Sequence, residues 1–102
     1  MPRFDLYRNP NQRATNGLYL DVQSDLISTS TRWCLPLFVA IAGTLLMSRA
    51  QWTVTVDEQS WVVDVPTILA VPKAMLREHR GRLRSADPLR VESAVDFMLR
   101  GC

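Results

Sequence analysis

Apolar and polar residues alternate in four short stretches of this chain: 3–7, 18–23, 52–56 and 61–65. Alternation with a period of two is typical of β-strands that bury one face. The third and fourth stretches are separated by a short turn at Asp57 to Gln59, and together they predict a hairpin. The first two flank a polar, turn-rich segment, so we expect a second hairpin with a long loop.

Two further apolar stretches do not alternate. Leu35 to Ala40 predicts a buried strand, with Pro36 near its start at a sheet edge, where a missing N–H is tolerated. Ile68 to Val71 predicts a short strand that Pro72 closes. The segment that follows, Lys73 to Arg84, is basic and mixed, and we expect a loop there.

The C-terminal end predicts a helix. Asp87 is a good N-cap, and Pro88 suits the first helical position, where its lost N–H costs nothing. Asp96 and Arg100 fall on the polar face. The stripe expected to pack on the sheet follows the spacing i, i+3, i+4, i+7 and consists of Val91, Ala94, Val95 and Met98. The elements predict one mainly β (α+β) domain over residues 1–102, an antiparallel sheet with one C-terminal α-helix.

Composition narrows the class of protein. A net charge of +2 over 102 residues is too small to predict nucleic acid as the main partner. The longest apolar stretch, Trp33 to Met47, is shorter than the roughly 20 residues of a membrane span and contains Pro36 and Gly43. We expect a buried strand followed by a helical or irregular turn, and no membrane segment. Without an apolar leader, the chain is expected in a reducing cytoplasm with Cys34 and Cys102 as free thiols.

The chain offers little catalytic chemistry. His79 is its only histidine, and no spacing places it beside a nucleophile and an orienting acid. One histidine and two distant cysteines do not make a zinc site, and there is no phosphate-binding glycine loop. We therefore predict no catalytic residue, metal or cofactor. Asp21 and Asp25 are expected to satisfy local backbone donors.

The remaining candidate residues have ordinary structural interpretations. Cys34 lies in an apolar stretch and is expected to be an inert core residue, whereas the last residue, Cys102, is expected to be exposed. We expect the tryptophans in the core or on a hairpin face; they are Trp33, Trp52 and Trp61.

A cluster of arginines lies in the basic segment near the C-terminal helix. Three interpretations stay open: a solvated face, a docking site for an acidic partner, or a contact with nucleic acid phosphates. The cluster consists of Arg77, Arg80, Arg82 and Arg84.

Several segments occur in an order that resembles the CcdB family of bacterial toxins, over nearly the whole chain. The resemblance implies an SH3-like antiparallel barrel-sheet that begins with a hairpin and ends with one packed helix. DVQSD is its most specific part. The segments are DVQSDLI (21–27), RWCLPL (32–37), SWVVDV (60–65), LAVP (69–72) and ESAVDFMLRGC (92–102).

The resemblance implies the toxin of a type II toxin–antitoxin system, of the kind that serves plasmid maintenance. Such a toxin is a cytoplasmic homodimer that is not an enzyme; it binds the DNA-cleaving GyrA component of DNA gyrase and traps its cleaved-DNA complex, and a CcdA-type antitoxin neutralises it. DNA is met only through gyrase or in a toxin–antitoxin operator complex. The gyrase-binding positions implied are Leu26, Ile27, Asp96, Leu99, Arg100, Gly101 and Cys102. The weaker antitoxin-binding positions are Arg77, Arg80, Arg82 and Arg84.

The chain departs from the family at its tail. The best-known member ends in Trp-Gly-Ile, and its tryptophan is taken to stack against a gyrase arginine. Arg100 stands at that place here, and two guanidinium groups face each other unfavourably. Asp96 stands where that member has an asparagine. Two alternatives therefore stay open: a MazF-type endoribonuclease toxin of the same fold, and a homologue that binds antitoxin without poisoning gyrase.

Overall fold

One antiparallel sheet and one C-terminal helix make up the described part of the chain. The computed structural model describes residues 3–26, 29–40, 51–83 and 87–100. Within these residues lie seven strands, two 3-10 turns and the helix. They are β1 (Asp5–Arg8), β2 (Asn16–Asp21), β3 (Thr31–Val39), β4 (Gln51–Val56), β5 (Gln59–Asp64), η1 (Val65–Thr67), β6 (Leu69–Pro72), η2 (Lys73–Met75), β7 (His79–Arg82) and α1 (Asp87–Arg100).

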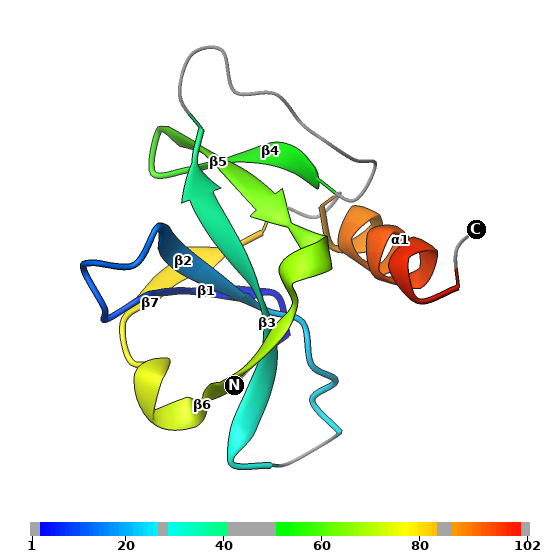
Figure 1. Ribbon diagram of the computed structural model, residues 1–102, viewed down its shortest axis with the longest axis horizontal. Coiled ribbons are helices and arrows are strands. Elements are labelled where there is room, and N and C mark those ends of the chain that lie inside the picture. The colour runs from blue at the N-terminus through cyan, green and yellow to red at the C-terminus, as the bar shows by residue number, and fades with distance from the viewer. Residues whose placement is uncertain (1–2, 27–28, 41–50, 84–86, 101–102) are drawn as a thin grey trace.

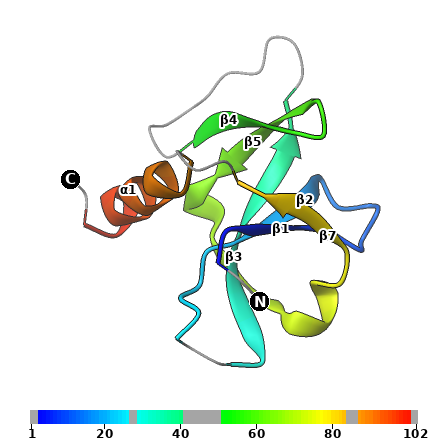
Figure 2. The same ribbon diagram turned by 180° about the vertical axis from the view of Figure 1, so that it is seen from behind.

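The sheet has the order β4-β5-β3-β2-β1-β7, and β6 also pairs with β3 (Figures 1 and 2). The long strand β3 is therefore central, because it pairs with β2 on one side and with both β5 and β6 on the other. The sheet curls into a half-barrel, and α1 packs beside η1 (Figure 1). The expected fold class, an antiparallel barrel-sheet with one C-terminal helix, is confirmed.

Both expected hairpins are present. β1 pairs with β2, with Leu6 opposite Leu20, and β4 pairs with β5. The β4–β5 turn is tighter than expected, because Gln59 already pairs with Val56. Its two central residues, Asp57 and Glu58, have φ of 50° and 65°. Positive φ at both positions matches the twist of the strands, although glycine or asparagine usually occupies at least one of them.

Two strand predictions need correction. The first strand begins at Asp5 and not before, because Phe4 has a φ of 72° and so leaves the extended region. β3 begins at Thr31, so Pro36 lies within the strand and not near its start at an edge. β6 pairs residues 31–34 of β3, and β5 pairs residues 37–39. Pro36 therefore lies between two ladders, where its missing N–H breaks no pair.

A third correction concerns the basic segment after Pro72, which is not only a loop. Residues His79–Arg82 form β7, which pairs with β1 at one end of the sheet. The register shifts between Asp5 and Tyr7, and Gly81 in the facing strand has a φ of 109°. An irregular ladder with a glycine conformation carries no alternating apolar pattern, which explains why sequence periodicity missed this strand.

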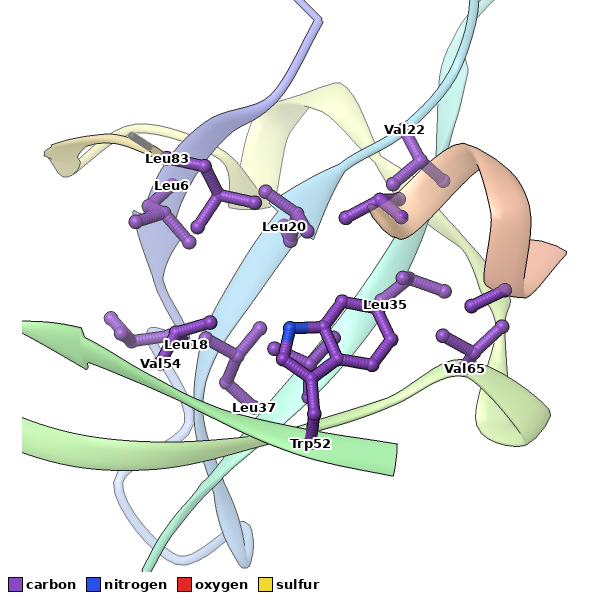
Figure 3. Packing of buried hydrophobic residues seen from close by; sticks show 13 residues of the cluster. Leu6, Leu18, Leu20, Val22, Leu35, Leu37, Trp52, Val54, Val65 and Leu83 are labelled. Atoms are coloured by element: carbon purple, nitrogen blue, oxygen red, sulfur yellow. The ribbon is translucent and has the colours of Figure 1, made fainter. Parts of the chain in front are cut away.

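The sheet has a hydrophobic cluster on each face. The main cluster includes Leu20, Leu35 and Trp52, whose side chains face one another in Figure 3, together with Val91 and Ala94 of α1. The helix therefore packs through its predicted stripe, although the side chain of Met98 lies outside the described residues. The smaller cluster lies on the other face and consists of Tyr7, Tyr19, Cys34, Val71 and Leu76. Strands expected to bury one face thus bury both.

The tryptophans behave differently from one another. Trp52 is 2% exposed and belongs to the core, as expected. Trp61 packs against the core while partly exposed. Trp33 is 50% exposed, so its expected place in the core or on a hairpin face is wrong. It pairs with Ala70 of β6, at the end of β3 that extends beyond the β5 ladder.

Among the described residues, no helix combines the length and the apolar character needed to cross a membrane.

Candidate functional site

The residues expected to meet gyrase lie in two places, the turn after β2 and the helix α1. Leu26 in the turn is 96% exposed, and Asp96 is exposed on α1. Leu99 and Arg100 lie in the last turn of α1, but their side chains are not described. The positions outside the described residues are Ile27, Gly101 and Cys102.

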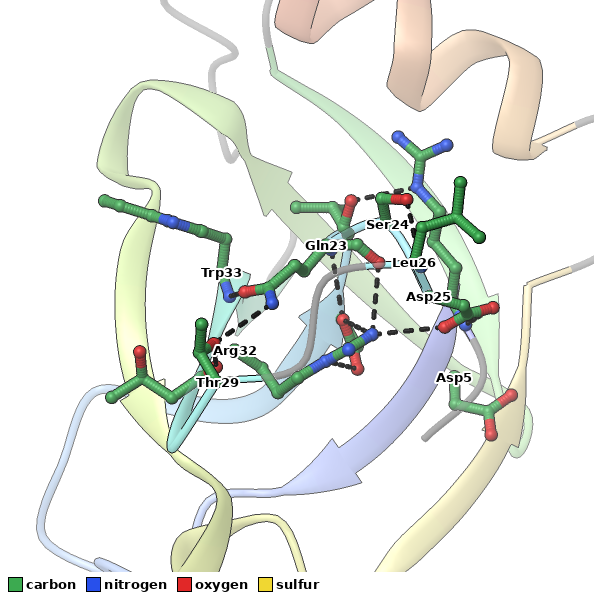
Figure 4. Close-up of polar contacts among 12 residues, drawn as sticks. Asp5, Gln23, Ser24, Asp25, Leu26, Thr29, Arg32 and Trp33 are labelled. Carbon is green, nitrogen blue, oxygen red and sulfur yellow. Dashed lines mark hydrogen bonds and ion pairs between the residues drawn. The ribbon is translucent and has the colours of Figure 1, made fainter.

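A buried ion pair anchors the turn after β2. Arg32 donates from Nε to Asp21 Oδ2 at 2.8 Å and from Nη2 to Asp21 Oδ1 at 3.0 Å (Figure 4). Asp21 is 0% exposed and Arg32 only 3%. Burial raises the pKa of Asp21, and the hydrogen bonds and charge of Arg32 oppose that shift. Two donors in a fork match two carboxylate oxygens, which sets the orientation of both side chains.

Gln23 extends this anchor into the turn. Its backbone N–H donates to Asp21 Oδ1 at 3.1 Å, and its carbonyl accepts from Arg32 Nη2 at 3.1 Å. Its side-chain oxygen accepts from the N–H of Trp33 at 3.0 Å, and its amide donates to Thr29 Oγ1 at 3.2 Å. The 5% exposed Gln23 thus bridges both sides of the turn. Asp21 does satisfy a local backbone donor, as expected, but its stronger partner is Arg32.

Asp25 and Ser24 shape the tip of the turn. Asp25 accepts from Arg32 Nη2 at 3.3 Å and from the backbone N–H of Arg3 at 3.2 Å. The hydrogen bond from Arg3, followed by those from Arg32, lowers the pKa of Asp25. Ser24 Oγ accepts from the N–H of Leu26 at 3.2 Å. These bonds hold Leu26 outward in solvent (Figure 4).

Arg3 joins this turn to α1. Its Nε donates to the carbonyl of Val22 at 2.9 Å, and its Nη1 pairs with Glu92 Oε1 at 3.0 Å. A shallow hollow beside this contact is lined by Arg3, Glu92, Val95 and Asp96. The turn and α1 lie at the same side of the molecule in both views (Figures 1 and 2). The structure therefore brings the elements of Leu26 and Asp96 onto one surface.

The basic segment has a second polar network. The carboxylate of Asp5, a 6% exposed residue, pairs with His79 Nε2 at 3.1 Å and with Arg82 Nε at 3.2 Å. The ring of Tyr7 meets that of His79 edge-on, with centroids 5.6 Å apart. His79 is therefore paired, in contrast to the solvated histidine that the sequence suggests. Arg77, Arg80 and Arg82 are exposed; Arg84 lies outside the described residues.

Neither network has the chemistry of a nucleophilic or metal site. Burial, then the charge of Asp21, raises the pKa of Cys34 to about 12, the opposite of what a reactive thiolate needs. Cys34 is fully buried, as expected. Among the described residues, no group of three or more His, Cys, Asp or Glu side chains could hold a metal. The arrangement suits protein recognition by an exposed surface.

The comparison with known families decides the identity. The model of the CcdB protein family matches residues 3–101. The chain belongs to the CcdB family. The match covers nearly the whole chain, which confirms the resemblance given by DVQSDLI and the later segments. No curated protein matches the chain. Membership of the CcdB family supports the role of a toxin in a toxin–antitoxin pair, one that is not itself an enzyme.

Three residues that organise the surface of this CcdB-family chain were not predicted from the sequence. Asp21 and Arg32 both lie in the segments that carried the resemblance, but their pairing is set by the β2–β3 register, where Asp21 faces Cys34. The only local signal was one charge of each sign at the end of two otherwise apolar strands. Arg3 gave no signal, because its partners lie 19 and 89 residues away in the chain.

Proposed function

We propose that this CcdB-family protein binds the DNA-cleaving GyrA component of DNA gyrase and traps the enzyme in its DNA-cleaved state. The observation that carries the proposal is Leu26, which is 96% exposed on a turn anchored by a buried ion pair. A large apolar side chain already held in place loses little conformational entropy when a partner pocket takes it. Two proteins would bind each other, and the toxin would break no bond.

The binding surface would combine the turn with the end of α1. Leu26 and Ile27 come from the turn, and Asp96 comes from the exposed face of α1 beside the hollow at Arg3 and Glu92. The tail of the chain completes this surface in the proposal. Its residues are Leu99, Arg100, Gly101 and Cys102.

We also propose that the protein acts in the cytoplasm as a homodimer that a CcdA-type antitoxin neutralises. A chain of 102 residues buries only about two thirds of its unfolded surface, so self-association adds apolar burial. The half-exposed Trp33 is an apolar side chain that a second copy would cover. Sedimentation at micromolar concentration should show a dimer, and a monomer alone would contradict this part of the proposal.

The decisive experiment mixes purified protein, DNA gyrase and supercoiled plasmid, and then scores linear DNA after detergent and protease treatment. Trapping of the cleaved complex should convert plasmid to the linear form only when both proteins are present. A lane with gyrase and a known poison shows that the enzyme is competent. No linear DNA in a competent reaction would refute gyrase poisoning.

Arg100 favours a second candidate, a family member that binds antitoxin without poisoning gyrase. An arginine in place of the family tryptophan presents a cation where the partner is taken to offer one too. Antitoxin binding by a protein that leaves plasmid supercoiled would support this candidate over the first.

The pair of His79 and Asp5 keeps a ribonuclease test worthwhile. A MazF-type enzyme needs an acid–base pair in a basic groove, and this pair lies beside Arg82 at 3.2 Å from Asp5. A lane with single-stranded RNA belongs in the same experiment. Cleavage there, lost in His79→Ala, would favour the ribonuclease.

A further inference from the structure

The strand β7 is an edge of the sheet. It ends the strand order β4-β5-β3-β2-β1-β7, and among the described residues it pairs with β1 alone. An edge strand presents unpaired backbone donors and acceptors, to which an extended peptide can add as a further strand. β7 is therefore a potential docking edge if its side chains admit a partner.

The charges around β7 select the kind of peptide. Arg77 and Arg80 are exposed, and Arg80 meets Glu78 only at 3.8 Å, which is a weak surface pair. Arg82 is more occupied, since it pairs with Asp5 and donates to the carbonyl of Arg3 at 3.0 Å. Cations on an edge repel neutral or basic strands of other proteins. The same cations attract a strand that carries acidic side chains.

A hollow lies along this edge. It is lined by Thr55, Val56 and Asp57 from the β4 side and by residues 80–83 from the β7 side. β4 is the other end of the curled sheet. A strand added to β7 would lie beside this hollow, which has room for a side chain next to Arg80.

We propose that β7 takes an acidic, extended segment of the antitoxin as an added strand. This inference rests on the proposed function, because it names how the antitoxin would bind. Backbone hydrogen bonds to β7 hold the segment, and its carboxylates meet Arg80 and Arg77. The edge then closes only around a strand of the correct charge.

The test uses a fluorescein-labelled peptide of alternating glutamate and threonine, measured by fluorescence anisotropy with the full chain. Three probes separate the contributions: the peptide itself, the same peptide with alternate backbone nitrogens methylated, and a lysine–threonine peptide. Methylation removes backbone donors but keeps the charge, so it distinguishes strand addition from charge attraction. Hydrogen exchange on β7 with and without peptide gives a direct readout of edge pairing.

Arg80→Glu is the test variant, and Arg13→Glu is its matched control. Arg13 is an exposed arginine in the β1–β2 loop, away from β7 in sequence. The acidic peptide should bind the unaltered chain, lose about tenfold or more in affinity with Arg80→Glu, and keep its affinity with Arg13→Glu. Binding should weaken as salt rises, and β7 amides should become protected.

Four results would overturn the proposal: equal binding of the methylated peptide, unchanged protection of β7, equal loss with both variants, or tighter binding of a labelled oligouridine than of the acidic peptide. The gyrase cleavage experiment on the unaltered chain is separate. Linear plasmid without peptide binding would refute this inference alone. Peptide binding without linear plasmid would refute gyrase poisoning and leave the docking edge intact.

Discussion

Arg32 and Asp21 form a forked ion pair inside the protein, with hydrogen bonds of 2.8 and 3.0 Å. The two side chains come from neighbouring strands, β3 and β2, and are essentially removed from solvent. Arg32 also reaches the carbonyl of Gln23 and the carboxylate of Asp25. One guanidinium thus links the sheet to the turn that presents Leu26, and the structure of the surface depends on it.

Replacing Arg32 with methionine should destabilise the protein by about 3–5 kcal/mol, because it leaves the buried carboxylate of Asp21 unpaired. Urea unfolding followed by tryptophan fluorescence measures the loss. The double variant Asp21→Leu with Arg32→Met removes both charges and should recover most of the stability. A loss below about 1 kcal/mol in the single variant, the range of an exposed ion pair, would contradict the buried-pair interpretation.

Cys34 should be unreactive in the folded protein. In a Cys102→Ser variant, a thiol reagent should label Cys34 only after urea unfolds the chain, because the thiolate is the reactive form. Burial raises its pKa from 9.0 to about 12. The unfolded chain therefore loses this proton first, and stability should fall as pH rises from about 9 to about 12. Rapid labelling of the native protein at pH 8 would contradict the burial.

Gly17 should be required by its neighbour Trp61. A Cβ at position 17 would lie 2.8 and 2.9 Å from the Cη2 and Cζ3 atoms of that ring. Gly17→Ala should therefore cost about 1–3 kcal/mol in the free energy of unfolding. Trp61→Leu frees the space, so alanine should cost less in that background. Equal costs in both backgrounds would show that the ring is not what excludes the side chain.

Leu26→Asp should reduce plasmid linearisation with gyrase at least tenfold and leave stability within about 0.5 kcal/mol, because Leu26 contributes little to the core. Val39→Asp is the matched control, an exposed aliphatic residue at the end of β3 with 46% of its surface accessible. Circular dichroism and urea unfolding check the fold of both variants. Equal loss of linearisation in the two variants would remove Leu26 from the proposed surface.

Arg100→Trp should raise potency on a gyrase that Trp-tailed family members recognise. The change removes a cation from the contact and restores an aromatic ring that can stack on an arginine. Titration of linear plasmid against toxin concentration measures the gain, and Arg100→Ala separates loss of the cation from gain of the ring. Unchanged potency in the tryptophan variant would mean that the chain uses another surface or another target.

Local pattern determined the two hairpins, the C-terminal helix and the fold class. Alternation over 52–56 and 61–65 depends only on neighbouring residues, and so does the stripe through Val91 and Ala94. The segments DVQSD and RWCLPL also sufficed to indicate the family that the match over residues 3–101 shows. The residues expected to bind gyrase were placed by that resemblance, and their role stays a prediction.

Only the tertiary structure decided which residues are shielded by distant parts of the chain. Curling of the sheet buries both faces of β2, so Tyr19 and Asp21 are interior although their strand alternates. Register brings Arg32 to Asp21, and the N-terminal Arg3 reaches Glu92 of α1. Trp33 is left half-exposed for the same reason. These contacts join residues far apart in sequence, and periodicity along the chain carries information only about the residues next to each other.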